Sequence, residues 1–127
     1  MATFSDLELK IVRWGEARKI VQNSNVLAQA HKTLEEVGEK IEAAAKLDLL
    51  AELIQKFPEI QEFKDFQNIC ERVAKEYVDA VGDVGVTQLI GCATADITYV
   101  ECLEKAFNEI KDRKGHLRPD GVFVKET

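Results

Sequence analysis

The sequence predicts an all-α protein, a bundle of four to five helices that forms one domain over residues 1–127. The chain has 127 residues, of which 46% are hydrophobic and 31% charged, with only 7 glycines and 2 prolines. This composition is typical of helix-rich globular proteins, and the length suits one hydrophobic core. Apolar residues also recur every three to four positions along most of the chain, which is the period of an amphipathic helix.

The first half of the chain divides into three expected helices. Ser5-Asp6-Leu7-Glu8 matches a capping box, which predicts a first helix from Asp6 to Val21. The polar turn Asn23–Asn25 precedes a second helix, Val26 to Lys46. Asp48 is a candidate cap for a third, over 49–56, and Pro58 must end it.

The second half of the chain predicts two further helices. Residues 59–68 should form one or two helical turns, followed by a long helix from about Gln67 toward Ile90. A last helix should begin at Thr94 or Asp96, and Gly115 is a plausible C-terminal stop. The apolar tail over 122–124 is too short to classify.

Charge and cysteine content limit the classes of function. The net charge of −6 and the pI near 5.0 argue against binding to a nucleic-acid polymer, which favours a basic surface. No apolar run approaches the 18 residues of a membrane span, and no secretory signal is visible. Cys70, Cys92 and Cys102 lack disulfide or metal-ligand spacing, so we expect buried thiols in a reducing cytoplasm.

Three carboxylates interrupt the apolar pattern of the segment Thr33–Ile41. Glu36 and Glu39 are three residues apart, and Glu35 and Glu39 four apart, so a helix places them on one surface. Like charges at these spacings repel, and a divalent cation would offset the repulsion. An ordinary solvated acidic face is the alternative interpretation.

A second acidic segment supports the interpretation of these glutamates as part of a cation site. Asp83 stands among valine, alanine and glycine, so we expect it to be buried, and Asp79 lies four residues earlier on the same helical face. Gly82 and Gly85 flank Asp83, as Gly38 separates Glu36 from Glu39, which suggests close approach of a helix or ligand, or close packing alone.

The available ligand types favour magnesium. Carboxylates from two helices form an all-oxygen site, which suits Mg²⁺. His31 and His116 complete no Glu-x-x-His pair of a di-iron bundle, and zinc lacks its usual ligands. Magnesium chemistry usually acts on phosphates.

The motifs resemble those of the MazG-like nucleoside triphosphate pyrophosphohydrolases, in particular small phage-encoded members. The resemblance is carried by Glu35-Glu36-Val37-Gly38-Glu39, by Gly82-Asp83-Val84, by Gln29–Lys32, and by the ending 107–115 with 121–125 beyond it. This chain departs from the family in two respects. Ala80 stands where the family has the Glu of E-x-x-D, and the acidic motifs are unusually far apart, with the excess expected over 47–68 as a helical insertion or lid.

The resemblance implies an all-α NTP pyrophosphatase-like fold and Mg²⁺-dependent cleavage of an NTP or dNTP to the monophosphate and pyrophosphate, with Mn²⁺ able to substitute. It also implies a homodimer or homotetramer, located in the cytoplasm, which is the host cytoplasm if a phage encodes the chain. The implied metal ligands are Glu36, Glu39 and Asp83, with Glu35 beside them and Asp79 as a substitute for the missing Glu. Glu35 and Glu39 are the candidates to orient or deprotonate water.

The implied substrate-binding residues are Lys32, Asn108, Lys111, Trp14, Gln29 and Lys114. The basic residues at 111–114 also have an ordinary explanation, as positive charges that are favoured at the C-terminus of a helix. Trp14 has one as well, as an anchor in the hydrophobic core. Three alternatives stay open: an enzyme for damaged nucleotides, a non-catalytic nucleotide-binding or protein-interaction relative, and a structural bundle without ligand.

Overall fold

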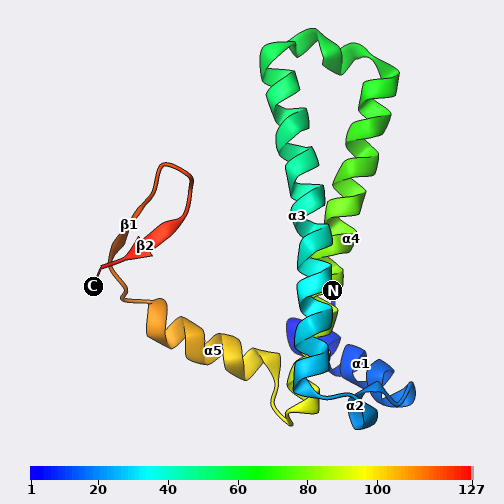
Figure 1. Ribbon diagram of the computed structural model, residues 1–127, viewed down its shortest axis with the longest axis vertical. Helices are drawn as coiled ribbons and strands as arrows, with labels where there is room; N and C mark the ends of the chain where they lie inside the picture. The colour runs from blue at the N-terminus through cyan, green and yellow to red at the C-terminus, as the bar shows by residue number, and fades with distance from the viewer. Residues whose placement is uncertain (127) are drawn as a thin grey trace.

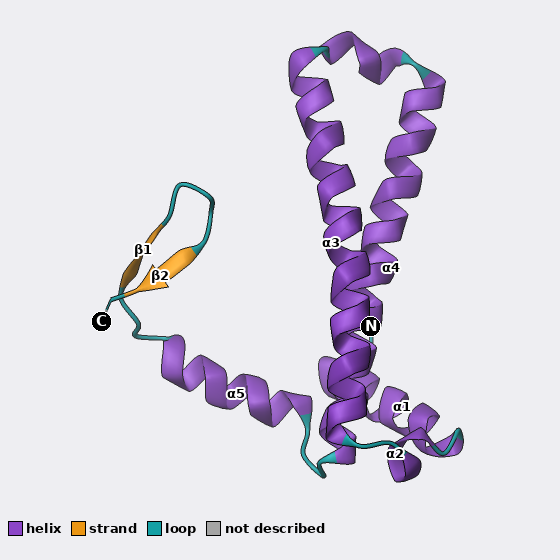
Figure 2. Cartoon of the chain, in the orientation of Figure 1, coloured by secondary structure: helices purple, strands orange, loops and turns teal. Residues whose placement is uncertain are grey.

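Two long antiparallel helices dominate the computed structural model, which describes residues 1–126 (Figure 1). They are α3 (Val26–Lys56) and α4 (Lys64–Thr94), joined by the short 3₁₀ helix η1 (Pro58–Glu62). The axes of the two helices diverge toward the η1 end (Figure 1). The described chain is therefore mostly helical, as the apolar period predicts (Figure 2).

The two helices pack along a seam in which buried positions recur every seven residues. Those on α4 include Phe66, Val73, Ala80 and Thr87. On α3 the buried residues are Glu36 and Ala43, again seven apart. A seven-residue repeat keeps one side of each helix facing its partner, as in a coiled coil.

The expected break near Asp48 is wrong, because α3 is continuous from Val26 to Lys56. Leu47, Leu50 and Ile54 are partly buried and continue the seam, so tertiary packing outweighs the weak helix propensity of one Asp. The segment 47–68 therefore lengthens the two helices and supplies the turn between them, rather than adding a separate hairpin or lid.

The N-terminal helix α1 (Phe4–Ala17) begins two residues before the expected start. Its capping box is formed by Thr3 and Asp6, not by Ser5 and Glu8. The expected single helix to Val21 is wrong as well, because Lys19 adopts the left-handed conformation (φ 63°) and a separate short helix α2 (Ile20–Asn23) follows. A Cβ at Gly15 would lie 2.6 Å from Cδ1 of Ile90, so glycine permits the close approach of α1 to α4.

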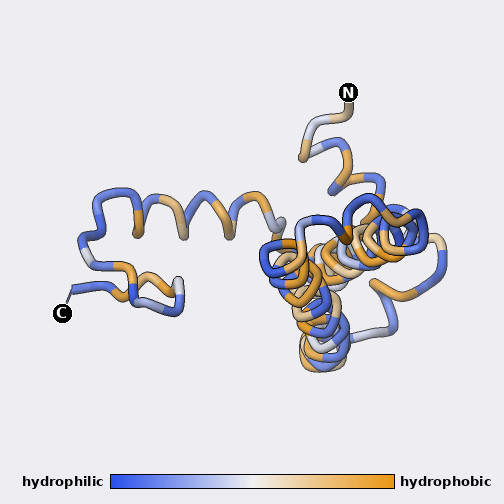
Figure 3. Tube along the Cα trace, turned by 90° about the horizontal axis from the view of Figure 1, so that it is seen from above, coloured by the Kyte–Doolittle hydropathy of each residue, from blue (hydrophilic) through white to orange (hydrophobic). Residues whose placement is uncertain are grey.

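The C-terminal part of the chain projects as an arm, defined here as residues 99–126. It consists of α5 (Tyr99–Ile110) and a hairpin of β1 (Gly115–Leu117) and β2 (Phe123–Lys125), paired antiparallel with His116 opposite Val124. Two views show the arm leading away from α3 and α4 (Figures 1 and 3). Gly115 therefore lies in a strand and is not the helix stop, because α5 ends at Ile110 with Lys111 as its C-cap.

Glu8 joins α1 to the arm. Its buried carboxylate accepts hydrogen bonds from the backbone N–H groups of Tyr99 (2.6 Å) and Val100 (3.4 Å) at the start of α5. Thr98 caps the same helix in a capping box with Glu101, which corrects the expected start at Thr94 or Asp96. The carboxylate thus supplies an acceptor to amides that have no partner within the first turn of α5, and its negative charge interacts favourably with the helix dipole.

The environment of the three cysteines differs from the one expected from the sequence. Cys70, Cys92 and Cys102 are half-buried free thiols rather than fully buried ones. Burial, together with the neighbouring Cys102 thiol, raises the pKa of Cys92 to about 11. Within the described residues, no helix combines the length and apolar character needed to cross a membrane.

Replacing Glu8 with alanine should lower the free energy of unfolding by about 1–3 kcal/mol, because two backbone amides at the start of α5 lose their acceptor. Urea denaturation measures the change. The matched control is Lys10→Ala, an exposed residue on the same helix, which should change stability by less than about 0.5 kcal/mol. Equal stability of the two variants would contradict the anchoring role.

Candidate metal centre

The register of α3 against α4 brings the two acidic motifs to the same level. Thr33 Oγ1 donates to Thr87 Oγ1 at 2.8 Å, and Lys46 Nζ lies 3.2 Å from a carboxylate oxygen of Glu76. Since the helices run antiparallel, positions between Thr33 and Lys46 on α3 face positions between Glu76 and Thr87 on α4. Residues more than forty apart in sequence therefore meet.

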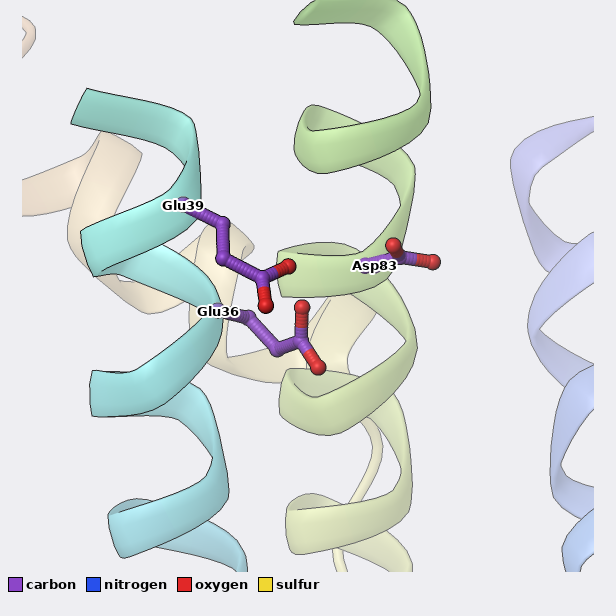
Figure 4. Close-up of side chains that lie close together, drawn as sticks. All are labelled: Glu36, Glu39 and Asp83. Atoms are coloured by element: carbon purple, nitrogen blue, oxygen red, sulfur yellow. The ribbon is translucent and has the colours of Figure 1, made fainter. Parts of the chain in front are cut away.

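Three carboxylates form a cluster at this level. One oxygen from each of Glu36, Glu39 and Asp83 lies within 4.8 Å of the other two. Figure 4 shows Glu36 and Glu39 projecting from α3 toward one another, while Asp83 extends from α4. The structure thus brings together three of the five residues expected from the sequence as metal ligands.

Glu36 is the buried member of this acidic cluster. Oε1 of Glu36 lies 3.3 Å from Lys32 Nζ, whereas Oε2 is buried and has no hydrogen-bond partner among the described residues. A buried carboxylate oxygen without a partner destabilises the fold by a few kcal/mol. The expectation that Asp83 is buried is wrong: Asp83 and Glu39 are exposed, because both lie at the edge of the seam.

The proximity of the carboxylates perturbs the titration of Glu39. The neighbouring Glu36 carboxylate, followed by the charges of Glu35 and Asp83, raises the pKa of Glu39 above its usual value. A divalent cation among these carboxylates would oppose this effect, because its charge favours the ionised form of Glu39.

Lys32 is the cation closest to the cluster. Its Nζ bridges Glu35 at 3.2 Å and Glu36 at 3.3 Å, and the hydrogen bond to Glu35 contributes most to raising the pKa of Lys32. Glu35 thus lies beside the acidic cluster, paired with Lys32, and outside the set of three that meet.

A cavity of about 260 Å³ opens next to the cluster, and it includes residues that the sequence analysis missed. Its lining consists of Glu39, Glu42, Ala43, Lys46, Glu76, Asp79, Ala80 and Asp83. Three- and four-residue spacings place Glu76 and Asp79 on the same helical face as Asp83, and Glu42 on the same face as Glu39. The helical period of the sequence could therefore have identified these residues as part of the site.

Asp79 lines this cavity without joining the cluster. Its side chain is 59% exposed and pairs with Lys75 at 3.1 Å. Ala80, where the resembled family has a glutamate, is buried in the helix seam and offers no ligand. In this conformation the centre therefore contains three grouped carboxylates, with Glu35 and Asp79 at its edges.

The other predicted substrate residues lie apart from the cluster. Trp14 is 42% exposed, with the Arg18 guanidinium 4.6 Å from its ring centroid, and Gln29 donates to Ser24 Oγ at 3.0 Å. The arm carries the remaining three, Asn108, Lys111 and Lys114, away from the cavity of the same copy (Figure 1).

The mid-helix glycines have free space around them. Among the described residues, nothing lies within 4 Å of a Cβ placed at Gly38, Gly82 or Gly85. The close approach expected at these glycines is therefore not made inside one copy, and packing between α3 and α4 does not require them.

Comparisons with known proteins identified no relative of this chain. No protein-family model matches the chain, and neither the curated proteins nor the solved structures contain a match. Function is therefore inferred from the residues of the site itself.

Replacing Glu36 with glutamine should raise the free energy of unfolding of the metal-free protein by about 1 kcal/mol, because it removes a buried charge and its repulsion of Glu39. Denaturation in the presence of a chelator measures this gain. Glu35→Gln is the matched control, since Glu35 also pairs with Lys32 but is 61% exposed, and it should have little effect. Destabilisation by Glu36→Gln would show that the Lys32 pair outweighs the burial cost.

The contribution of Glu39 to the stability of the metal-free protein should fall as the pH rises from the ordinary glutamate pKa through the raised pKa of Glu39. The sign follows because a raised pKa means that the folded state holds the proton more tightly, and this advantage disappears once both states are deprotonated. Urea midpoints measured across this pH range, with chelator present, test the slope. Glu39→Gln should flatten it, and an unchanged slope in that variant would contradict the assignment.

Proposed function

We propose that the chain is a Mg²⁺-dependent nucleoside triphosphate pyrophosphohydrolase, which converts an NTP or dNTP to the monophosphate and pyrophosphate. The observation that supports this best is the buried, unpartnered Oε2 of Glu36, a residue whose carboxylate clusters with those of Glu39 and Asp83. Such an arrangement is unfavourable without a ligand, and a divalent cation satisfies it.

The residues present fit a hard cation. Oxygen ligands on opposite sides of Mg²⁺ are about 4.2 Å apart, whereas the three oxygens spread over as much as 4.8 Å. Glu39 and Asp83 are exposed and can rotate to close this difference. Mn²⁺ prefers the same oxygen ligands and should substitute.

The proposed roles follow from position. Glu36, Glu39 and Asp83 would hold the cation, which supplies neutralisation of phosphate oxygens when bound. Lys32 would exchange its ion pair with Glu35 for a phosphate oxygen, because its ammonium group is half exposed beside the cluster. Glu35, released from Lys32, is then free to orient the attacking water or accept its proton, a role for which Glu39 is the other candidate.

A non-catalytic nucleotide-binding relative is the second candidate. The observations that favour it are the buried Ala80, which offers no ligand, and the pairing of Asp79 with Lys75 away from the cluster. A centre with three carboxylates would still bind a cation and a triphosphate, but it would have fewer groups to position the reacting atoms.

Pyrophosphate release from a panel of NTPs and dNTPs, with Mg²⁺, with Mn²⁺ and with chelator, tests the proposal. Release should require the cation, and Asp83→Asn should lower it by about 100-fold or more, since a metal ligand is lost. Asp79→Asn is the matched control on the same helix and should retain most of the activity, because Asp79 pairs with Lys75.

The outcome decides between the two candidates. Nucleotide binding that depends on Mg²⁺ and on Asp83, without pyrophosphate release from any nucleotide, would establish the non-catalytic alternative. Absence of both cation binding and nucleotide binding in the folded protein would reject both.

A further inference from the structure

One copy of the chain exposes more surface than a compact protein of its mass. The accessible surface is 9674 Å² for 14.3 kDa, whereas a compact monomer of that mass exposes about 6,800 Å². The excess of about 2,900 Å² per copy exceeds the ~800 Å² that each partner of a standard interface buries. The exposed area is therefore large enough for a stable association.

Part of this surface is an apolar row on α3, defined here as the α3 outer stripe: Leu27, Leu34 and Ile41. The three residues are seven apart, and each side chain is more than 60% exposed. The helical period places them on the side of α3 opposite Glu36, which faces α4. Nothing else in the described chain covers this stripe, so its burial requires another molecule.

The arm carries a second apolar face of matching kind. Leu103, Phe107 and Ile110 follow one another at four and three residues along α5, and they are 44 to 60% exposed. Leu117 and Phe123 extend this apolar character into the hairpin. Two views show the arm projecting from the α3–α4 pair, so α5 packs on neither long helix along its length (Figures 1 and 3).

The exposed area and the charge of the arm's tip favour a second copy of this chain as the occupant. Between 111 and 125 the tip has five basic residues and two acidic ones, whereas the arm as a whole has six of each and the rest of the chain carries the net charge of −6. The tip of the arm is thus attracted to the acidic body of another copy. A reciprocal exchange also covers both unpartnered faces at once, as a closed twofold dimer does.

We propose that the arm of each copy packs on the α3 outer stripe of a second copy, in a reciprocal dimer. Leu103, Phe107 and Ile110 of one copy would bury Leu27, Leu34 and Ile41 of the other. The proposal specifies how the expected homo-oligomer forms, and it is independent of the chemistry at the acidic cluster.

Analytical ultracentrifugation of the full chain tests the interface. The wild type should be a dimer, and both Leu34→Glu and Phe107→Lys should raise the dissociation constant by about 30-fold or more, as for a buried interface residue. The matched control is Val78→Glu, which places the same charge at an equally exposed valine (68%) on the outer side of α4 and should leave the dimer intact.

A mixing experiment separates a lost contact from a folding defect. Leu34→Glu and Phe107→Lys should each be monomeric alone, since both arm contacts of a homodimer carry the substitution. Mixed together, they should form a heterodimer at least about 30-fold tighter than either homodimer, because one arm contact is then fully native and the other pairs Lys with Glu.

Three results would overturn the proposal: a wild-type monomer at the highest soluble concentration, dissociation by Val78→Glu alone, or no heterodimer in the mixture of folded variants. None of these results depends on catalysis, so a failure here is distinct from a failure of the proposed hydrolase. An inactive protein that shows the expected pattern of association would still support the interface.

Discussion

The burial of Glu36 between α3 and α4 is the constraint on which the rest of the site depends. Glu36 occupies a position of the helix seam that an apolar residue would normally fill, as Ala43 does seven residues later. Apolar packing and the Thr33–Thr87 hydrogen bond hold this register despite the cost of the buried carboxylate. Sequences that retain such a cost usually do so at functional sites, where stability is given up for binding.

The same arrangement places charge inside and apolar side chains outside. Glu36 faces α4, whereas Leu34 and Ile41 on the same helix are exposed. Between Leu34 and Ile41, α3 of one copy therefore buries a charge and exposes apolar side chains, the reverse of an ordinary amphipathic helix, whereas Leu47 and Leu50 keep the usual polarity nearer η1. A cation at Glu36 and another molecule on the outer side would together make this arrangement favourable.

The helical class and the Glu36–Glu39 pair could be predicted because both are encoded in short spacings, whereas Asp83 was joined to that pair by its setting among apolar residues and by the family resemblance. Which face of a helix is buried could not be predicted, since the period is the same for either face, and this is why Asp83 rather than Glu36 was expected to be the buried acid. Two overlapping motifs, Ser5-x-x-Glu8 and Thr3-x-x-Asp6, both match a capping box. Thr3 and Asp6 form it, whereas Glu8 accepts a hydrogen bond from the start of α5, a tertiary contact that the local sequence does not indicate. The exposure of the arm depends on long-range packing, which no local pattern records.

Charge balance at the site connects the two proposals. Lys32 beside the cluster and Lys46 in the cavity lining are both ion-paired with glutamates. A triphosphate carries several negative charges and would enter a cavity whose lining is mostly acidic. One cation and one lysine compensate this charge poorly, whereas the arm holds Lys111, Arg113 and Lys114 outside the cavity of its own copy. A reciprocal dimer would place each arm on the outer side of the partner's α3, so these cations would reduce the negative potential of the acidic body through long-range electrostatics rather than by contact in the cavity.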